Sequence, residues 1–198
     1  MTNLAGSEAR PLDEKPTRFV PGQPDMWVFV LFESLLFTGY FSVYLFERTQ
    51  NQQLFLQSQS DLDLRFGVFN TVALLLSSWA IARCVQAARE GAYRSAMINV
   101  SLTIAFGAVF LSSKIVEWVI EIRMGHTFTS DVFFQHYFFL TSIHCIHVLI
   151  GFVVLGVVVY QLRSPARRSQ QLVETGATYW HTVDFLWVLI FALLYVVR

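Results

Sequence analysis

The sequence predicts an all-α, polytopic membrane protein folded as a bundle of five transmembrane helices. Hydrophobic residues make up 55% of the 198 residues, and charged residues make up only 14%. A soluble domain has about a quarter charged residues. The mean hydropathy is +0.50. The charges fall between long apolar segments, each able to supply the roughly 20 residues of a membrane span. A soluble enzyme and a disordered chain are therefore both excluded.

The first two helices are expected over residues 25–47 and 66–88. The apolar stretch of the first contains a single charged side chain, Glu33. The second lies where no charge falls between Arg65 and Arg83. Each stretch is long enough to cross a bilayer once.

The other three helices are expected over residues 94–123, 131–162 and 176–197. No charge separates Arg94 from Lys114 in the third helix, and none separates Asp131 from Arg163 in the fourth. The fifth contains Asp184 as its one charged side chain before the carboxyl terminus. The third and fourth segments exceed the bilayer thickness, so we expect them to tilt or to project from the membrane.

Residues 1–24 form a polar tail ahead of the transmembrane domain, which we expect to comprise residues 25–198. The tail has no apolar stretch of the kind found in a cleaved signal peptide. Nine Lys and Arg side chains fall on the amino-terminal side of the expected bundle and four on the other side. Positive charge accumulates on the cytoplasmic side. We therefore expect a cytoplasmic amino terminus and a carboxyl terminus outside.

Five ionisable side chains are expected to share one layer in the cytoplasmic half of the membrane. A helix rises about 1.5 Å per residue, and this spacing brings together three helices. The residues are Glu33, His144, His147, His181 and Asp184. Ionisable groups at this depth are costly and usually face the protein interior. They predict either a polar network that fixes helix packing or a lipid-linked or proton-linked site.

Glu33 has no basic neighbour on its own helix. We therefore expect a neutral carboxylic acid there, unless a histidine reaches it from another helix. Near the outer end of the third helix, Lys114 and Glu117 are three residues apart. Residues at this spacing share a helix face, so we expect an interfacial ion pair.

No metal site and no catalytic residue are expected in this chain. A metal site needs three or four converging ligands, whereas the histidine spacing places only two on one face. Haem ligation requires paired histidines on two helices, and the fifth helix offers only His181. Cys84 and Cys145 lie within apolar runs and are interpreted as buried thiols. Without a basic patch, no nucleic-acid partner is expected.

Two segments have distinctive polar residues in apolar runs: FFLTSIHCIHVLIG (138–151) and TYWHTVDFLWVLIF (178–191). Together they resemble subunit III of the haem-copper cytochrome c oxidases. The family patterns are Thr-Gly-x-His-x-x-His-Val-x-x-Gly and Tyr-Trp-His-Phe-Val-Asp-x-x-Trp. Ser142 stands where the family has glycine, and Thr182 stands where it has phenylalanine.

Two further segments extend the resemblance to about residues 25–198. FESLLFTGYF (32–41) is similar to a family helix in which Glu33 occupies the carbodiimide-reactive position, and NTVALLLSS (70–78) is similar to the next helix. The five helices match the last five of the seven in mitochondrial members, as in short bacterial forms. The opening PGQPDMWVFVLFE (21–33) resembles the variant encoded beside nitric oxide reductases.

The resemblance implies a non-catalytic accessory subunit in a bacterial inner membrane. It would bind the catalytic subunit I and other subunits of a respiratory oxidase that transfers electrons from cytochrome c to oxygen. Haem and copper would lie in those partners, and this chain would bind phospholipid and support proton uptake. A quinol oxidase or nitric oxide reductase remains an alternative parent complex. From another class, a stand-alone proton-coupled transporter and a small membrane cytochrome remain open.

Overall fold

The computed structural model describes residues 22–197, and all regular structure in this range is helical. The elements are α1 (Pro24–Gln50), α2 (Gln52–Asp61), α3 (Leu64–Arg89), α4 (Tyr93–Arg123), α5 (Val132–Arg163), a 3-10 turn (Pro165–Arg167), α6 (Gln170–Phe191) and a π-helical turn (Ala192–Val196). Within these described residues, five helices are long and apolar enough to cross a membrane. The predicted all-α five-helix bundle is therefore confirmed.

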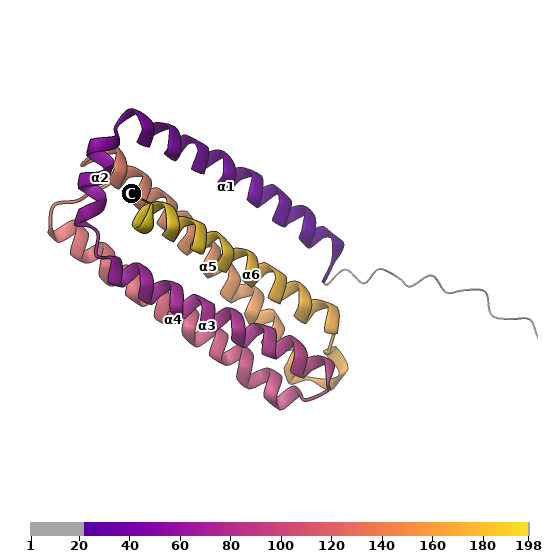
Figure 1. The fold of residues 1–198 in the computed structure, drawn as a ribbon. Coiled ribbons are helices and arrows are strands. Elements are labelled where there is room, and N and C mark those ends of the chain that lie inside the picture. The colour runs from indigo at the N-terminus through magenta and orange to yellow at the C-terminus, as the bar shows by residue number, and fades with distance from the viewer. Residues whose placement is uncertain (1–21, 198) are drawn as a thin grey trace, which may run out of the picture.

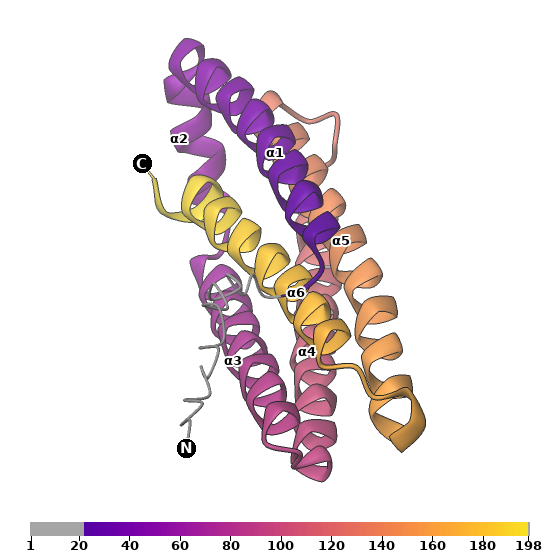
Figure 2. The ribbon, with the colours of Figure 1, turned by 90° about the vertical axis from the view of Figure 1, so that its right-hand side faces the viewer.

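Helices α3, α4, α5 and α6 form the body of the bundle, and α1 lies along its outside (Figures 1 and 2). Helix α3 packs against α4 and α6, and α5 packs against α6 and α4. Helix α1 makes its contacts mainly with α6 and α2. Its buried side chains are Glu33, Phe37 and Tyr44. One carboxylate is thus among the few α1 residues that the bundle encloses.

Side chains that satisfy free backbone N–H groups mark where the helices start. The Asp63 carboxylate accepts a hydrogen bond from the Arg65 amide at the start of α3. At the start of α5, the Asp131 carboxylate accepts one from the Phe134 amide at 2.8 Å. Ser169 does the same for α6. These acceptors supply partners for amides that have none within the helix.

The fifth membrane helix begins at Gln170, so its expected start at 176 was wrong. The first turn is polar, so hydropathy does not mark it as part of a membrane span. It is helical because Ser169 caps it and because Glu174, one turn later, pairs with Arg89 of α3 at 2.9 Å. Of the expected tail and terminus, residues 1–21 and 198 lie outside the described residues.

The short helix α2 was not expected. Its sequence QQLFLQSQSD is too short and too polar for a membrane span. Phe55 nevertheless lies fully buried, with its ring 5.7 Å from that of Phe133. The Ser58 hydroxyl donates to the Asp131 carboxylate at 2.9 Å. Tertiary contacts with the start of α5 therefore hold α2 in place.

Trp180 of α6 occupies the centre of the bundle. A Cβ atom at Gly107 of α4 would lie 2.9 Å from its indole, and one at Gly151 of α5 would lie 2.8 Å from it. The indole Nε1 donates to the Ser77 hydroxyl of α3 at 2.8 Å. Two glycines and one serine thus allow three helices to close around a single large ring.

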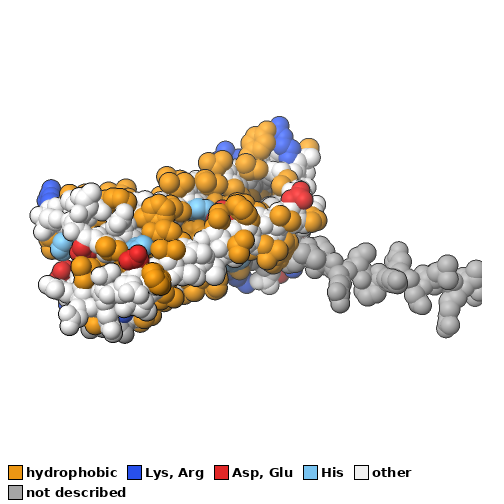
Figure 3. Space-filling view, turned by 90° about the horizontal axis from the view of Figure 1, so that it is seen from above, with side chains coloured by type: hydrophobic (Ala, Val, Ile, Leu, Met, Phe, Trp, Pro, Cys, Tyr) orange, Lys and Arg blue, Asp and Glu red, His pale blue; other side chains and the backbone are white. Residues whose placement is uncertain are grey.

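The flanks of the bundle are apolar, and the charges gather toward its ends (Figure 3). Large hydrophobic side chains are exposed along α1, where Val28, Leu31 and Leu35 have 67% to 71% of their surface accessible. In water such a surface would drive aggregation, whereas in a bilayer it faces acyl chains.

Candidate functional site

Glu33 and His147 form an ion pair or hydrogen bond between α1 and α5. The His147 Nε2 atom lies 3.2 Å from Glu33 Oε2. The other ring nitrogen, Nδ1, lies 2.8 Å from the Ile143 carbonyl oxygen. A carbonyl oxygen only accepts, so Nδ1 carries a hydrogen and donates it. Nε2 and the Glu33 carboxyl group are therefore placed to share one proton, held either as a carboxylic acid or as an imidazolium.

The pair lies at the edge of a small cavity of about 300 Å³ between α1 and α5. Its other lining residues are largely apolar and include Leu36, Phe37, Tyr40, Phe139 and Ile143. The Phe37 and His147 rings meet edge to face, with centroids 5.7 Å apart.

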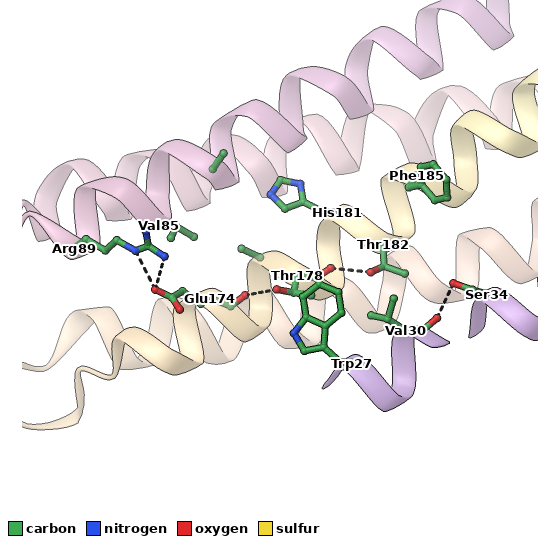
Figure 4. Close-up of a pocket in the computed structure, with 12 residues that line it drawn as sticks. Trp27, Val30, Ser34, Val85, Arg89, Glu174, Thr178, His181, Thr182 and Phe185 are labelled. Atoms are coloured by element: carbon green, nitrogen blue, oxygen red, sulfur yellow. Dashed lines mark hydrogen bonds and ion pairs between the residues drawn. The ribbon is translucent and has the colours of Figure 1, made fainter. Parts of the chain in front are cut away.

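A second, larger groove of about 540 Å³ runs between α1, α3 and α6. Figure 4 shows Arg89 and Glu174 at one end, and Trp27, Thr178 and His181 further along. The hydroxyls of Thr178 and Thr182 donate to carbonyls of their own helix, so their hydrogens are already used. The groove is therefore apolar along its length and charged at one end.

His181 pairs with α3 rather than with Asp184. Its Nδ1 atom lies 2.7 Å from the Ser78 hydroxyl oxygen. Asp184 is 4% exposed, and neither carboxyl oxygen has a hydrogen-bond partner among the described residues. Ser78 is the polar neighbour of this carboxyl group.

His144 is fully buried, and its two ring nitrogens also lack hydrogen-bond partners within the described chain. The ring lies between Phe110 and Trp187, at centroid distances of 5.4 and 5.2 Å. The expected single network is thus divided. Glu33 and His147 join α1 to α5. His181 and Asp184 of α6 face Ser78 of α3. His144 is enclosed by aromatic rings.

Lys114 and Glu117 pair at 3.0 Å, but in the interior of the bundle rather than at an interface. The Lys114 side chain is fully buried. Its ammonium group also donates to the hydroxyls of Tyr137 at 3.1 Å and Tyr195 at 2.8 Å. Both tyrosines donate in turn to the other Glu117 oxygen. All three ammonium hydrogens are therefore used, which compensates for burying the charge.

Sequence reasoning missed the tyrosines of this cluster and the Arg89–Glu174 pair. Tyr137 and Tyr195 lie in apolar runs, where spacing alone does not distinguish a hydrogen-bonding tyrosine from a packing one. Glu174 could have been found, because an acid near the start of a membrane helix needs a partner. Among residues 22–197, no three His, Cys, Asp or Glu side chains come together as metal ligands.

Comparison with known proteins places this architecture in a family. The family described as cytochrome c oxidase subunit III matches residues 22–197. Cytochrome c oxidase subunit 3 of Thermostichus vulcanus is 31% identical over 172 residues, covering 85% of this chain and 84% of the relative. The Synechocystis protein of the same name is 30% identical over 182 residues, covering 88% and 77%.

Quinol oxidase subunit 3 of Bacillus subtilis is 25% identical over 171 residues, covering 85% of this chain and 83% of the relative. Both kinds of oxidase subunit thus align along nearly the whole described bundle. The match to the family covers all six helices and the residues that line both cavities. The chain belongs to the cytochrome c oxidase subunit III family.

Proposed function

We propose that this protein is the non-catalytic subunit III of a haem-copper respiratory oxidase. It supports electron transfer from cytochrome c to oxygen without a redox centre of its own. The observation that carries the proposal is the family match over residues 22–197. The haem and copper belong to partner subunits, among them the catalytic subunit I. The protein spans a bacterial inner membrane with its amino terminus in the cytoplasm.

Purification of the complex tests this role. The full chain carries an affinity tag and is purified from its native membrane in mild detergent. We expect haem-carrying subunits to co-purify, identified by mass spectrometry and by a haem absorption band. Elution of the chain without any haem-carrying subunit would contradict the proposal. A tagged membrane protein from another complex serves as the control for detergent carry-over.

A quinol oxidase is the second candidate for the parent complex. The supporting observation is the alignment with the Bacillus subtilis quinol oxidase subunit 3 along 85% of this chain. Oxidation of reduced cytochrome c by the purified complex supports the first candidate. Oxidation of a quinol, with no cytochrome c oxidation, supports the second.

The groove between α1, α3 and α6 is proposed to hold a phospholipid. The groove is largely apolar, and its volume of about 540 Å³ suits an acyl chain. Arg89 at one end suits a headgroup. Thr178→Trp would fill the groove, whereas Val153→Trp would enlarge an exposed side chain on α5 away from it. We expect loss of tightly bound phospholipid from the purified complex only in Thr178→Trp, measured by lipid mass spectrometry. Equal lipid content in both variants would exclude this groove.

The Glu33–His147 pair is proposed to be the proton-linked site. Its support is the single shared proton, which follows from the Nδ1 contact with the Ile143 carbonyl. The cavity beside the pair is lined by apolar side chains such as Leu36 and Phe139, which give the site a low dielectric constant. Such a pair changes its charge distribution when one proton moves over a short distance.

A further inference from the structure

Beyond the Arg89–Glu174 pair, three more side-chain hydrogen bonds join α6 to α3 along one seam. The Trp180 indole donates to Ser77 at 2.8 Å, and the Trp187 indole donates to Thr71 at 3.1 Å. Between these two lies the contact of His181 Nδ1 with Ser78, at 2.7 Å. Each indole N–H already has an acceptor on α3, so these two hydrogen bonds hold α6 against α3 and take no part in proton transfer.

Asp184 lies in the same seam, between the turns that carry His181 and Trp187. Asp184 is 4% exposed, and its carboxyl oxygens complete no hydrogen bond with any described residue. Its polar neighbour is Ser78, and no Lys or Arg of the described chain forms a hydrogen bond with it. An ionised carboxylate would be uncompensated in this setting. This setting therefore favours a neutral carboxyl group, whose O–H group has Ser78 as its polar neighbour.

Ser78 can connect this acid to the groove. A hydroxyl accepts one hydrogen bond while donating another. With a small side-chain rotation, Asp184 donates to Ser78 Oγ, while Ser78 donates to Nδ1 of His181. The proton of the neutral His181 ring then resides on Nε2. His181 itself lines the groove between α1, α3 and α6 (Figure 4).

We propose that Asp184 is a buried proton-binding site that exchanges with the groove through Ser78 and His181. In the outward step, the O–H bond of Asp184 breaks and its proton passes to Ser78 Oγ. The Ser78 hydrogen passes to His181 Nδ1, and the Nε2 proton passes to a water molecule that enters from the charged end of the groove. Exchange is completed when a proton from water returns to Asp184 by the same route in reverse. While both ring nitrogens are protonated, the imidazolium compensates the carboxylate across one hydroxyl. The site is separate from Glu33, which pairs with α5.

Infrared spectroscopy of the full chain in lipid nanodiscs tests this path. A protonated carboxyl gives a C=O stretching band that shifts when its hydrogen is replaced by deuterium. We expect such a band in the wild type and its loss in Asp184→Asn. After transfer to heavy water, we expect the band to shift at least tenfold more slowly in Ser78→Ala. Ser77→Ala is the matched control, because Ser77 is adjacent on α3 but its hydroxyl bonds to the Trp180 indole and the Leu74 carbonyl rather than to His181.

Several outcomes would overturn the proposal. Absence of an Asp184 band would show an ionised carboxylate. Equal exchange rates in Ser78→Ala and the wild type would show that another route is used. Equal slowing in Ser77→Ala and Ser78→Ala would attribute exchange to opening of the whole seam. If Asp184→Asn does not fold, a shifted band in Asp184→Glu makes the assignment instead. Each of these results leaves the oxidase role unaffected.

Discussion

Glu33 shows how one backbone carbonyl defines the chemistry of a buried pair. The Ile143 carbonyl orients the His147 ring, so Nε2 faces Glu33 at 3.2 Å with one proton between them. The expectation of a neutral acid depended on whether a histidine reached it, and His147 does. The pair is uncharged overall in either proton position, which lowers the cost of placing it in the membrane.

Replacing Glu33 by glutamine should leave assembly intact. The amide N–H can donate to His147 Nε2, so the contact between α1 and α5 persists. We expect the purified variant complex to retain its haem spectrum while losing part of its proton-linked activity or its lifetime during turnover. Subunit content is measured by gel electrophoresis and activity by oxygen consumption.

A hydrophobic carbodiimide should label Glu33 in preference to Asp184, because Glu33 lines a cavity and Asp184 does not. Peptide mass spectrometry locates the adduct. Failed assembly of Glu33→Gln, together with an unlabelled Glu33, would mark the residue as an ionised packing anchor. The proton-linked role would then be wrong.

Lys114 should be much less tolerant of change than an exposed residue of the same helix. Lys114→Met leaves Glu117 buried without its cation, a loss of about 3 to 5 kcal/mol in the free energy of unfolding. The double variant Lys114→Met/Glu117→Gln should recover part of this loss, because the glutamine oxygen still accepts from Tyr137 and Tyr195. Unfolding in a denaturing detergent measures all three proteins.

The exposed Ser112 provides the control, since its hydroxyl bonds only to its own helix at Ala108. Ser112→Ala should change stability by less than about 0.5 kcal/mol. A Lys114→Met variant as stable as Ser112→Ala would show that the ion pair contributes nothing. A double variant less stable than the single one would show that Glu117 has a further partner.

At the scale of helices, hydropathy predicted all five spans because the bilayer imposes their length whatever the tertiary contacts. It did not predict α2, whose ten residues are held by Phe55 and Ser58 against the start of α5. Hydropathy also does not locate the helix ends, because these too depend on tertiary contacts. The polar first turn of α6 is helical through a cap and a partner on α3.

The residues of the candidate site could be selected from the sequence, but their partners could not. Spacing shows which residues share a face of one helix. It does not show how two helices rotate against each other. His147 and Asp184 lie on neighbouring helices, yet one pairs with α1 and the other lies beside Ser78 of α3. The expected common layer therefore separated into distinct contacts.

Two glycines of α5 provide a matched test of helix packing. A Cβ atom at Gly151 would lie 2.8 Å from the Trp180 ring, whereas one at Gly156 would meet nothing within 4 Å. Gly151→Ala should cost about 1 to 3 kcal/mol through overpacking. Gly156→Ala should be neutral or stabilising by up to about 1 kcal/mol, because alanine favours the helix. Thermal unfolding that ranks the two variants in the opposite order would contradict the packing around Trp180.

On the scale of the whole molecule, α1 is the membrane helix with the fewest buried residues. Only three of its residues are buried, and it leaves cavities of about 300 and 540 Å³ on its two sides. A helix so weakly attached to its own bundle depends on lipid or on neighbouring subunits for the rest of its surroundings. Both cavities and the Glu33–His147 pair lie along this helix, so the proposed site and the weakest packing coincide.

The charge distribution of the whole molecule predicts its orientation. In the described part, six arginines lie at the end where α3 meets α4 and α5 meets α6, and three lie at the other end. By the positive-inside rule, we expect the first end to face the cytoplasm.

Gln53 and Ala166 are exposed at opposite ends, and the native Cys84 and Cys145 are buried. Single cysteines at Gln53 and Ala166 should therefore react with a membrane-impermeant maleimide from opposite sides. In intact cells stripped of the outer membrane, we expect labelling of Gln53→Cys only, and Ala166→Cys should react once the membrane is opened. Labelling of both from the same side would contradict an odd number of spans between them, and labelling of Ala166→Cys alone would reverse the orientation.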